Sequence, residues 1–536
     1  MAKQGLISAV LYLPQKVAYD LAEVAESVKS ILQSTYQEYE IILVDSRESD
    51  RGNFEFVEKL FKGNKRKFKP VVGDFKNRAA MFNAALAQAK GEYILNINNI
   101  KAPVLLKQNA LDVFRWGMIR SKKPGLVYAD YELMSETGSI SERKLLDWHP
   151  GRLRDESDHG VVWMLSQKAL KKIGGADEQY NAADIYDLRL KMSEQFDMMH
   201  IGNKVRGSLY TVKSQKVTHD VFSYLLAGKD IQLEMEKAVT EHLKRINAYL
   251  APGQNYRPVQ YTPEEEAQFK ECIASVVIPV YNRPEFIGYA IESVQAQTVK
   301  NIEVIVVVNG GPSDATADTV RRYMEGGDKY KPGVPPVRLI VVDINNIGYC
   351  LNTGLSQARG KYYVQLDSDD RLFPDAVEKI LKVYKEDPKI GMVIGSYEVW
   401  QMASDGSITR RDEIPVVTHD EWTSENGRNN LLRINGAGAP RSAHIKVFRE
   451  MGWFDINDSP FARNYGEDYN MVNQVDEQYV IGRVWDAIYK VIRHAGSTDH
   501  SIDQVTIDKN DEAKDHMRLE TIRRRQAINK KAAKKS

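Results

Sequence analysis

Cysteine is scarce in this chain, which has only Cys272 and Cys350 among its 536 residues. So few cysteines exclude a disulfide framework and a cysteine-rich metal site, and they fit a reducing compartment. No apolar run approaches the roughly 18 residues that a membrane-spanning helix needs. The short apolar run at residues 6–13 ends at Pro14 without a small-residue cleavage site, so we expect a first strand there rather than a signal peptide.

An excess of either charge is also missing. Lysine and arginine total 74 and aspartate and glutamate total 73, which gives a formal net charge of +1. A near-neutral chain argues against a protein whose main role is to hold nucleic acid, so no nucleic-acid partner is expected. Together with the missing membrane span, this predicts a cytoplasmic protein. The length suggests roughly two to four domains.

Charge of one sign gathers at the C-terminal end. Residues 521–536 hold seven lysine or arginine residues and no acid, and we expect a basic C-terminal tail over 516–536. One interpretation is a solvated, frayed end. The other is electrostatic attachment to an anionic membrane surface or another polyanion, which would place the protein at the inner face of a membrane.

The chain contains an internal repeat. The segment 83–93 recurs without a gap at 352–362, where the central Leu-x-Gln-Ala and the following glycine and tyrosine are shared. The segments 30–35, 40–44 and 125–133 match 293–298, 303–307 and 391–399 in the same order. Chance resemblance does not keep its register over so many segments, so the sequence predicts two copies of one domain.

Each copy alternates short buried strands with amphipathic helices. In the second copy we expect strands at 276–279, 304–308 and 337–342, helices at 284–296, 315–324 and 348–358, and a further strand that ends at Asp367. Continuous valine and isoleucine runs between amphipathic helices indicate an α/β, Rossmann-like domain with a mostly parallel sheet and flanking helices. Between the copies, 231–249 reads as a helix and 251–263 as a proline-containing linker.

The second copy ends a strand on three closely spaced acids, Asp367, Asp369 and Asp370. Carboxylates this close repel one another unless a cation or solvent separates them. Mg²⁺ and Mn²⁺ take oxygen ligands and often bind through one or two carboxylates plus substrate phosphates, so the first hypothesis is a metal–diphosphate site. The alternative is a helix N-terminus decorated with acids. Asn309 and Asp343 also follow strands, and ligands of such sheets bind beyond the carboxyl ends of the strands.

Several motifs together resemble family 2 glycosyltransferases of the GT-A fold. They are the strand and loop at 276–282, Ser293-Val294-x-x-Gln297-Thr298, the acidic motif at 366–370 and Gly466-Glu467-Asp468-Tyr469-Asn470. The resemblance covers most of 272–500 and, more weakly, most of 5–215. The tandem layout is similar to bacterial two-domain polysaccharide synthases of the chondroitin-polymerase type, and the helix around 241–245 resembles the connector of such enzymes.

This resemblance implies two GT-A domains in tandem. We expect a degenerate domain at 1–215, a helical connector and linker at 216–271, a catalytic domain at 272–515 and the tail at 516–536. It implies an inverting transfer from a nucleotide sugar, with UDP as the expected nucleotide, to a glycan, lipid-linked or protein acceptor. Family 2 members invert, so a single in-line displacement is implied.

The resemblance also implies a Mn²⁺ or Mg²⁺ site. Asp369 matches the direct metal ligand, Asp367 would contact the metal or the donor's ribose, and Asp370 would be a further or alternate ligand. The family usually completes this site with a histidine downstream of the base. His494 lies at the expected position, and His500 is the second choice.

Asp468 matches the family's catalytic base, with Glu467 beside it; the alternative is that both acids merely cap the helix that follows. The expected donor site is wider. The family commonly has aspartate near Asn309, so the nucleobase stays open, and Arg283 could pair with phosphate. The full expected set of donor contacts is Pro279, Tyr281, Arg283, Asn309, Asp343, Asn352, Asp367 and Ser368.

The first copy lacks the acidic motif. Alignment from the shared glycine places Asn98 opposite Asp367 and Lys101 opposite Asp370. Alignment from the following proline instead places Asn96, Asn98 and Asn99 opposite the three acids. Neither register keeps a carboxylate, and amides bind Mg²⁺ or Mn²⁺ far more weakly than carboxylates do.

The other functional positions of the first copy are mixed. Ser214 lies near the register of His494, whereas Asp184 survives opposite Asp468. A base without a site for the leaving group is idle, so we predict that the first copy lacks metal-dependent transfer. It would then bind acceptor or a partner, or brace the second copy.

Other functions compete with this one. A non-catalytic glycan-binding or scaffold protein would need both copies to be inactive, against the acids and His494 of the second copy. A nucleotidyltransferase would need a glycine-rich basic loop after the first strand, which residues 279–284 do not form. A third possibility is a metal-free mechanism in the first copy.

Overall fold

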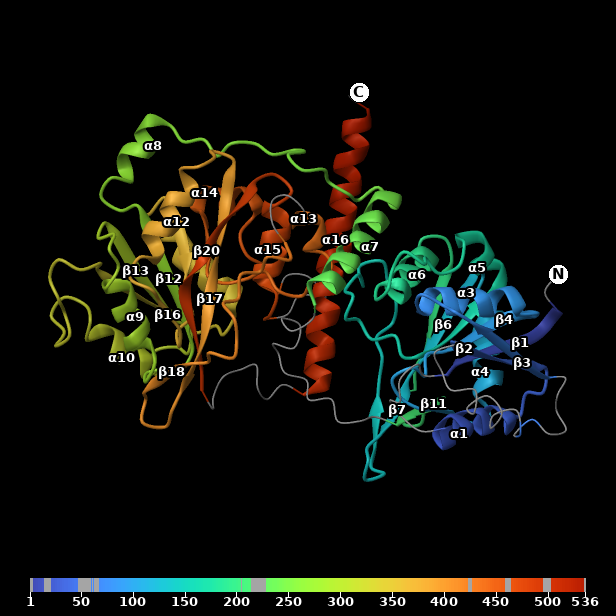
Figure 1. Cartoon of the computed structure of the whole chain (residues 1–536). Helices are drawn as coiled ribbons and strands as arrows, with labels where there is room; N and C mark the ends of the chain where they lie inside the picture. Colours follow the sequence, from blue (N-terminus) through green and yellow to red (C-terminus); the bar gives the residue numbers. More distant parts are fainter. Residues whose placement is uncertain are drawn as a thin grey trace. The chain divides into compact units, whose positions relative to one another are not determined.

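The computed structural model folds into two compact units, Met1–Ile246 and Asn247–Ser536, and each is described by itself (Figure 1). Within the part that the structure describes, no helix is both long and apolar enough to cross a bilayer. The described residues are 3–13, 21–46, 59, 61, 67–203, 205–213, 228–422, 427–457, 464–494 and 503–534.

The first unit is built on a seven-stranded sheet in the order β10-β6-β9-β4-β1-β2-β3, beside a small sheet in the order β5-β11-β7-β8. Its elements are β1 (Lys3–Tyr12), α1 (Leu21–Leu32), β2 (Tyr39–Ser46), β3 (Phe68–Gly73), α3 (Arg78–Gln88), β4 (Gly91–Ile97), β5 (Val104–Leu106), α4 (Ala110–Arg120), β6 (Pro124–Ala129), β7 (Tyr131–Met134), β8 (Ile140–Arg143), β9 (Val162–Ser166), α5 (Gln167–Ile173), α6 (Asp184–Ser193), β10 (Asp197–Ile201), β11 (Tyr210–Lys213) and α7 (Lys229–Arg245).

The second unit is built on one sheet in the order β14-β13-β12-β15-β19-β17-β20-β16, with β18 paired to β17. Its elements are α8 (Pro263–Gln268), β12 (Ala274–Val280), α9 (Ile287–Gln295), β13 (Ile302–Val308), α10 (Thr316–Arg321), β14 (Val337–Val341), α11 (Ile347–Ser356), β15 (Tyr362–Gln365), β16 (Arg371–Leu372), α12 (Ala376–Tyr384), β17 (Ile390–Met402), β18 (Ile408–Arg410), α13 (Gly427–Asn430), β19 (Arg441–His444), α14 (Ile445–Met451), α15 (Glu467–Val475), β20 (Val480–Arg493) and α16 (Gln504–Ala533).

The two large sheets have the same topology. Read from one edge, β3-β2-β1-β4-β9-β6-β10 corresponds strand by strand to β14-β13-β12-β15-β19-β17-β20. In both units the central pairs are parallel, and β9 and β19 run antiparallel to both of their neighbours. The predicted tandem of α/β domains with mostly parallel sheets is therefore confirmed.

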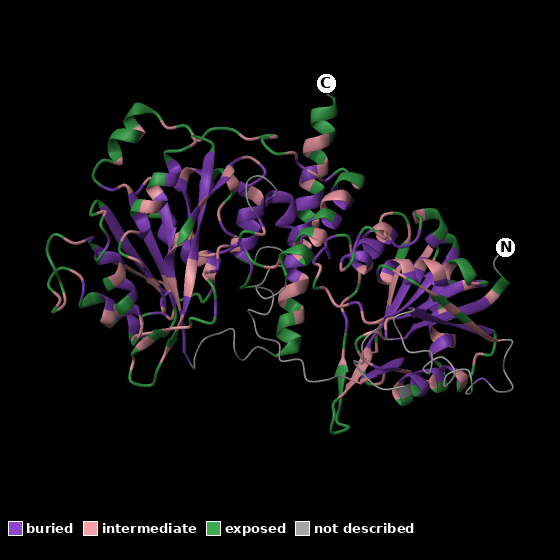
Figure 2. Ribbon diagram, in the orientation of Figure 1, coloured by how far each residue is buried: buried purple, intermediate pink, exposed green. Residues whose placement is uncertain are grey.

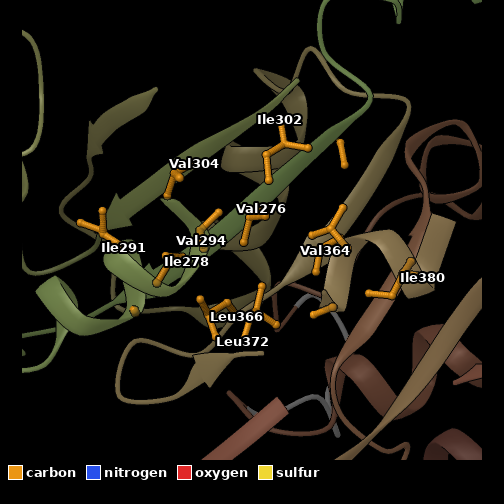
Figure 3. Packing of buried hydrophobic residues seen from close by; sticks show 14 of the residues in the cluster. Val276, Ile278, Ile291, Val294, Ile302, Val304, Val364, Leu366, Leu372 and Ile380 are labelled. Carbon is orange, nitrogen blue, oxygen red and sulfur yellow. The ribbon is translucent and has the colours of Figure 1, made fainter. Parts of the chain in front are cut away.

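Continuous burial explains why the central strands read as unbroken apolar runs. Every residue of β13 is buried, and β12 is buried except at Pro279. Val276, Ile278 and Val304 of these strands pack against Ile291 and Val294 of α9 (Figure 3). Each such buried side chain contributes about 1.5–3 kcal/mol relative to exposure, so the strands that carry the site have a rigid base.

A buried carboxylate joins three segments of the second unit. Glu303 on β13 accepts hydrogen bonds from Ser275 Oγ at 2.7 Å and from the Arg359 backbone N–H at 2.8 Å. The Gly360 N–H donates to the same Ser275 hydroxyl at 3.0 Å. Arg338 and Arg359 form ion pairs with Glu303, each at 3.0 Å. This Ser–Glu–Gly network ties β12, β13 and the turn before β15 together.

The first unit has the same network. Glu40 accepts from Ser8 Oγ and from the Lys90 N–H, both at 2.7 Å, and the Gly91 N–H donates to Ser8 Oγ at 2.9 Å. Lys69 forms an ion pair with Glu40 at 2.8 Å. The Ser–Glu–Gly hydrogen bonds and one cationic partner of the glutamate are thus repeated in the two units, as a duplication predicts.

The ends of the two units differ from the sequence-based boundaries. Helix α7, expected in a separate connector, belongs to the first unit, and residues from Asn247 onward belong to the second. The expected boundary at 515/516 falls inside the continuous helix α16, so the frayed tail is a wrong prediction over the described part of this segment. Figure 2 shows buried and exposed residues along α16, and Arg518 and Arg525 are fully buried. Attachment of its exposed basic end to a membrane stays a prediction.

Candidate functional site

Four parallel strands bring their carboxyl ends to one edge of the second sheet. Tyr281 and Asn309 follow β12 and β13 directly, and Asp343 and Asp367 lie two residues beyond β14 and β15. Because these strands are neighbours in the order β14-β13-β12-β15, the four residues share the edge that the sequence predicted.

The structure brings Asp369 and His494 together. His494 Nε2 lies 3.0 Å from Asp369 Oδ2, although 125 positions separate them in the chain. His494 directly follows β20, and its ring stacks on Phe286 at 4.4 Å between centroids. The loop after β12 supplies Phe286, so strand and loop together fix the imidazole. His500 lies outside the described residues.

The other two acids have different surroundings. Asp370 is buried, and its Oδ1 accepts a hydrogen bond from the Ile492 N–H at 2.7 Å, which ties the acidic loop to β20. Asp367 is half-buried, and its Oδ1 accepts from Gln365 at 3.2 Å. Burial raises the pKa of Asp367, and burial with the charges of Asp369 and Asp367 raises the pKa of Asp370 well above its usual range. Arg441 offsets only part of this effect at Asp367, so burial and mutual repulsion dominate at both carboxylates.

Arg441 of β19 connects the acidic loop to the expected base. Its Nη1 lies 3.0 Å from Asp468 Oδ2, and its Nε donates to Gln365 Oε1 at 3.2 Å. Burial alone would lower the pKa of Arg441. The carboxylates of Asp468 and Asp367 outweigh burial and raise that pKa. The guanidinium is therefore a fixed charge between the two acids.

The neighbours Glu467 and Asp468 differ in charge. Burial, reinforced by the charge of Asp468, raises the pKa of Glu467 to about 8. Burial would also raise the pKa of Asp468, but Arg441 and Lys514 outweigh it and hold that pKa below the usual range. At neutral pH, Asp468 is therefore the ionised member of the pair and Glu467 the protonated one. Both acids lie in the first turn of α15, with Gly466 as the left-handed residue before it.

The loop after β12 is shaped by α10. Asp314 Oδ2 accepts from the Asn282 N–H at 2.8 Å, and Thr316 Oγ1 accepts from the Arg283 N–H at 2.9 Å. These contacts leave Tyr281 exposed and Pro279 half-buried. The Arg283 guanidinium lies 5.8 Å from the Phe286 ring, so this loop reaches the ring that stacks on His494.

The remaining expected donor contacts lie on or near the same edge. Asn309 is buried, and its Oδ1 has no hydrogen-bond partner among the described residues, as expected of a group that is available to a ligand. Asp343 is exposed, and its carboxylate packs closely on Gly311. A Cβ at that glycine would lie only 2.9 Å from Asp343 Oδ1. Ser368 is buried within the acidic loop.

Asn352 has a structural role that its expected donor contact did not anticipate. Its Nδ2 donates to the Phe454 carbonyl and its Oδ1 accepts from the Phe454 N–H, both at 2.9 Å. In the first unit, Asn83 makes the same pair of bonds with Ala176 at 2.8 and 3.0 Å. A contact kept in both copies belongs to the framework, and a donor contact of Asn352 stays a prediction.

The donor set of the second unit fits a divalent cation. Asp369 and His494 supply a carboxylate and an imidazole that already meet, and Asp367 adds a carboxylate with a raised pKa. Carboxylates suit Mg²⁺ and Mn²⁺, and an imidazole ligand favours the transition metal of the two. Asp370 Oδ1 accepts from the Ile492 N–H, which positions the loop, and a further metal contact of Asp370 stays a prediction.

The corresponding region of the first unit is closed by internal hydrogen bonds. Tyr12 is buried, and its hydroxyl donates to Asn96 Oδ1 at 2.7 Å. Asn99 accepts from the Tyr12 N–H at 2.9 Å and donates to its carbonyl at 2.8 Å. Asn96 and Asn99, which the register counted from the proline places opposite Asp367 and Asp370, therefore brace the end of β1.

Asp184, the surviving counterpart of the base, is also engaged. It is fully buried and forms a two-point ion pair with Arg78 at the start of α3, with Arg78 Nε 2.8 Å from Oδ2. Although burial opposes the charge, Asp184 raises the pKa of Arg78. Both carboxylate oxygens of Asp184 are thus held by one guanidinium.

The structure also decides between the two registers of the acidic segment. The Thr298 N–H donates to the Pro374 carbonyl at 2.8 Å, and its counterpart Thr35 donates to Gln108 at the same distance. Gln108, rather than Pro103, therefore corresponds to Pro374, and the register counted from that proline is wrong. The register from the shared glycine, which places Asn98 opposite Asp367, agrees with the strand pairing.

Sequence reasoning missed several residues of this site. Arg441 lies in a segment with no recognisable motif. The strand register places Trp163 at the equivalent position of the first copy, so the arginine is specific to the second copy. Phe286, Asp314 and Thr316 lie in loops without a periodic pattern. Lys514 lies in a segment that we had assigned to the end of the catalytic domain, beside a tail.

The comparisons with known proteins agree with this fold and site. The family model "Glycosyl transferase family 2" matches residues 19–99 and 275–449, one region in each unit. Each unit is therefore similar to that family over its matched region. The relatives carry the same description: an uncharacterized glycosyltransferase of Rickettsia felis is 26% identical over 396 residues, which is 67% of this chain and 61% of that protein.

A chondroitin synthase of Escherichia coli is 27% identical over 247 residues, covering 46% of this chain and 32% of that protein. The predicted similarity to polysaccharide synthases is thus confirmed. The chain spans less than two thirds of the length of these relatives. Among solved structures, TarS of S. aureus in complex with UDP-GlcNAc aligns with 16% identity and a TM-score of 0.34, over 44% of this chain and 64% of that one.

Proposed function

We propose that the second unit is an inverting, metal-dependent glycosyltransferase site and that the first unit is non-catalytic. The observation that carries this proposal is the contact of Asp369 with His494 at the edge where an ionised Asp468 is paired with Arg441. The first unit has Asn98 and Lys101 in place of Asp367 and Asp370, and its remaining carboxylate, Asp184, is paired with Arg78.

The side chains have complementary tasks. Asp468 is the ionised acid, so it accepts the proton of the acceptor hydroxyl as that oxygen attacks the sugar. Arg441 holds Asp468 in place, and the protonated Glu467 can donate a hydrogen bond. The rim residues Tyr281, Asn309 and Asp343 would orient the nucleoside, and Arg283 would face its phosphates.

Asp369, His494 and Asp367 would hold Mn²⁺ or Mg²⁺. When bound, such an ion neutralises the charge that develops on a leaving diphosphate. The donor would be a nucleotide sugar, with UDP as the expected nucleotide. Similarity to a protein named chondroitin synthase supports a growing glycan as acceptor ahead of a lipid-linked or protein acceptor.

The test is nucleotide release from a panel of UDP-, GDP- and dTDP-sugars with Mn²⁺. Asp369→Asn removes a carboxylate from the metal site and should abolish release. Asp184→Asn makes the same chemical change at the first copy's counterpart of the base and should spare it. EDTA should abolish release by the wild type, and added Mn²⁺ should restore it.

A non-catalytic scaffold is the competing function. It predicts no release from any donor, with or without added oligosaccharide acceptors, together with glycan binding by calorimetry. Release that survives Asp369→Asn but is lost with Asp184→Asn would assign the chemistry to the first copy and overturn the proposal.

A further inference from the structure

Lys514 of α16 lies behind the helix turn that carries the proposed base. The residue is buried, and its Nζ donates to the Asn435 carbonyl at 2.6 Å. Gly466, which precedes Glu467, has a φ of +91°, and a Cβ there would lie 3.3 Å from both Cγ and Cε of Lys514. The lysine stem therefore packs directly on the glycine that starts α15.

The aromatic neighbours complete this environment. The Lys514 ammonium lies 4.4 Å from the centroid of the Tyr465 ring and 5.6 Å from that of Tyr469. Tyr465 and Tyr469 flank Gly466, Glu467 and Asp468 in the chain, so the ammonium is centred on this turn. Cation–π contacts of this kind stabilise a desolvated ammonium.

Helix α16 is anchored so that Lys514 has a fixed position. Arg518 and Asp515 form an ion pair at 2.6 Å with both side chains fully buried, and Arg518 also donates to the Ile434 carbonyl at 2.7 Å. Arg525 pairs with Asp476 at 3.1 Å, just beyond α15. The contacts of Arg518 with Ile434 and of Arg525 with Asp476 tie α16 to its neighbouring segments, so Lys514 is presented to α15 from a packed helix.

The charges around the base come from four segments of the second unit. Arg441 of β19 pairs with Asp468, Asp367 contributes a negative charge from the acidic loop, and Glu467 lies next to Asp468 on α15. From α16, Lys514 favours the ionised form of Asp468, with Arg518 and Asp511 as its own charged neighbours. Burial lowers the pKa of Lys514 to about 8, so the lysine is charged at neutral pH.

The first unit shows the opposite charge at the corresponding place. Helix α7 packs against α6 as α16 packs against α15. Its Glu234 accepts hydrogen bonds from the backbone N–H groups of Asn181, Ala182 and Ala183, at distances of 2.7 to 3.2 Å. Those residues directly precede Asp184. The copy that we propose to be non-catalytic thus has a carboxylate behind its base position, and the other copy has an ammonium.

We propose that Lys514 is a positioning residue for the transfer reaction: its ammonium fixes the turn at Gly466 and keeps Asp468 ionised, so α16 completes the site. This inference rests on the proposed function of the second unit. Lys514 does not need to touch the substrate, because its charge acts through Asp468.

The experiment compares the pH dependence of kcat/KM for the full chain and three variants, with the donor identified in the release assay. Lys514→Met removes the charge and should move the acidic limb of the profile up by about one pH unit, a roughly tenfold loss at pH values below the limb. Lys514→Arg should restore the wild-type limb. Lys530→Met changes an exposed lysine of the same helix and should have no effect.

A second measurement is independent of turnover. Carboxyl ¹³C signals of aspartate are followed by NMR in a pH titration without added metal, and Asp468→Asn identifies the Asp468 signal by its loss. The Asp468 midpoint should rise in Lys514→Met and remain near wild type in Lys514→Arg. If the wild type is inactive on every donor, the proposed function fails, and this titration still decides the inference. Lys514→Gln replaces Lys514→Met if the latter does not give a folded circular dichroism spectrum.

Two results would overturn the inference. One is an unchanged acidic limb and an unchanged Asp468 midpoint in folded Lys514→Met. The other is an equal loss of activity at every pH in Lys514→Met and Lys514→Arg, which would assign Lys514 a packing role only.

Discussion

Replacing the buried Glu303 should destabilise the second unit alone. The side chain is 0% exposed, and its Oε1 accepts hydrogen bonds from Ser275 and from the Arg359 N–H. Its Oε2 faces Arg338 and Arg359. Glu303→Ala leaves the buried hydroxyl and N–H without an acceptor, whereas Glu303→Gln keeps one acceptor and turns an amide toward the two guanidinium groups.

The magnitude follows from these contacts. Each buried polar group left without a partner costs about 1–3 kcal/mol, so Glu303→Ala should lower the free energy of unfolding of the second unit by about 3 kcal/mol. The arginines are 34% and 60% exposed and can be solvated again, so the ion pairs contribute little of that loss. Glu303→Gln should therefore cost less, about 1–2 kcal/mol.

Glu40 gives a matched control because it makes the same contacts in the first unit. Native-state hydrogen exchange with mass spectrometry reads both units in one molecule. Peptides from β12 and β13 should lose protection in Glu303→Ala, and peptides from β1 and β2 should lose it in Glu40→Ala. Nucleotide release should fall in the first variant only.

The same network gives a pH dependence. Burial alone would raise the pKa of Glu303 and of Glu40. Their N–H, hydroxyl and cationic partners outweigh burial and hold both pKa values below the usual range. A lowered folded-state pKa gives stability that is present above the unfolded value, about 4.3, and is lost as the pH falls through the folded value. Glu303→Gln should remove that acid-induced loss from the second unit alone. Loss of protection in both units, or in the wrong one, would refute the assignment of this network to separate units.

Three further perturbations test other contacts. His494→Ala should raise the Mn²⁺ concentration for half-maximal nucleotide release by at least about tenfold, and an unchanged Mn²⁺ dependence would remove His494 from the metal site. Arg78→Met leaves Asp184 buried and unpaired, so hydrogen exchange should show a loss of about 3 kcal/mol in the first unit with nucleotide release unaffected. Gly466→Ala forces a left-handed residue against Lys514 and should cost about 1–3 kcal/mol, seen as a lower unfolding midpoint of the second unit and a lower kcat.

The sequence predicted the fold well because the relevant signals are periodic. Buried parallel strands need continuous apolar runs, and these runs gave β12, β13 and β14 to within two residues. The repeat then carried the same architecture to the first copy. Helix ends were less accurate: α9 starts at Ile287 instead of residue 284, because the preceding turn is shaped by hydrogen bonds from α10.

The site was predictable only where its residues follow strands or form a contiguous motif. Asp367 and Asp468 were found in this way, whereas Arg441 and Lys514 carry no local pattern. Their roles depend on the antiparallel strand β19 and on a helix at the end of the chain. The framework role of Asn352 was not predicted, because a motif residue gives no signal for hydrogen bonds to a distant backbone segment.

Helices α7 and α16 also determine where this chain can be divided. Each unit closes with a helix that belongs to its own sheet, so the smallest independently expressible piece of the second unit begins near Asn247 and reaches Ala533. A fragment cut at residue 515 would retain Asp515 and Asp476 in the interior but lose Arg518 and Arg525, their buried partners. Any loss of stability or activity in that fragment would thus reflect the two unpaired buried carboxylates, and it would not show whether the removed segment has a function of its own.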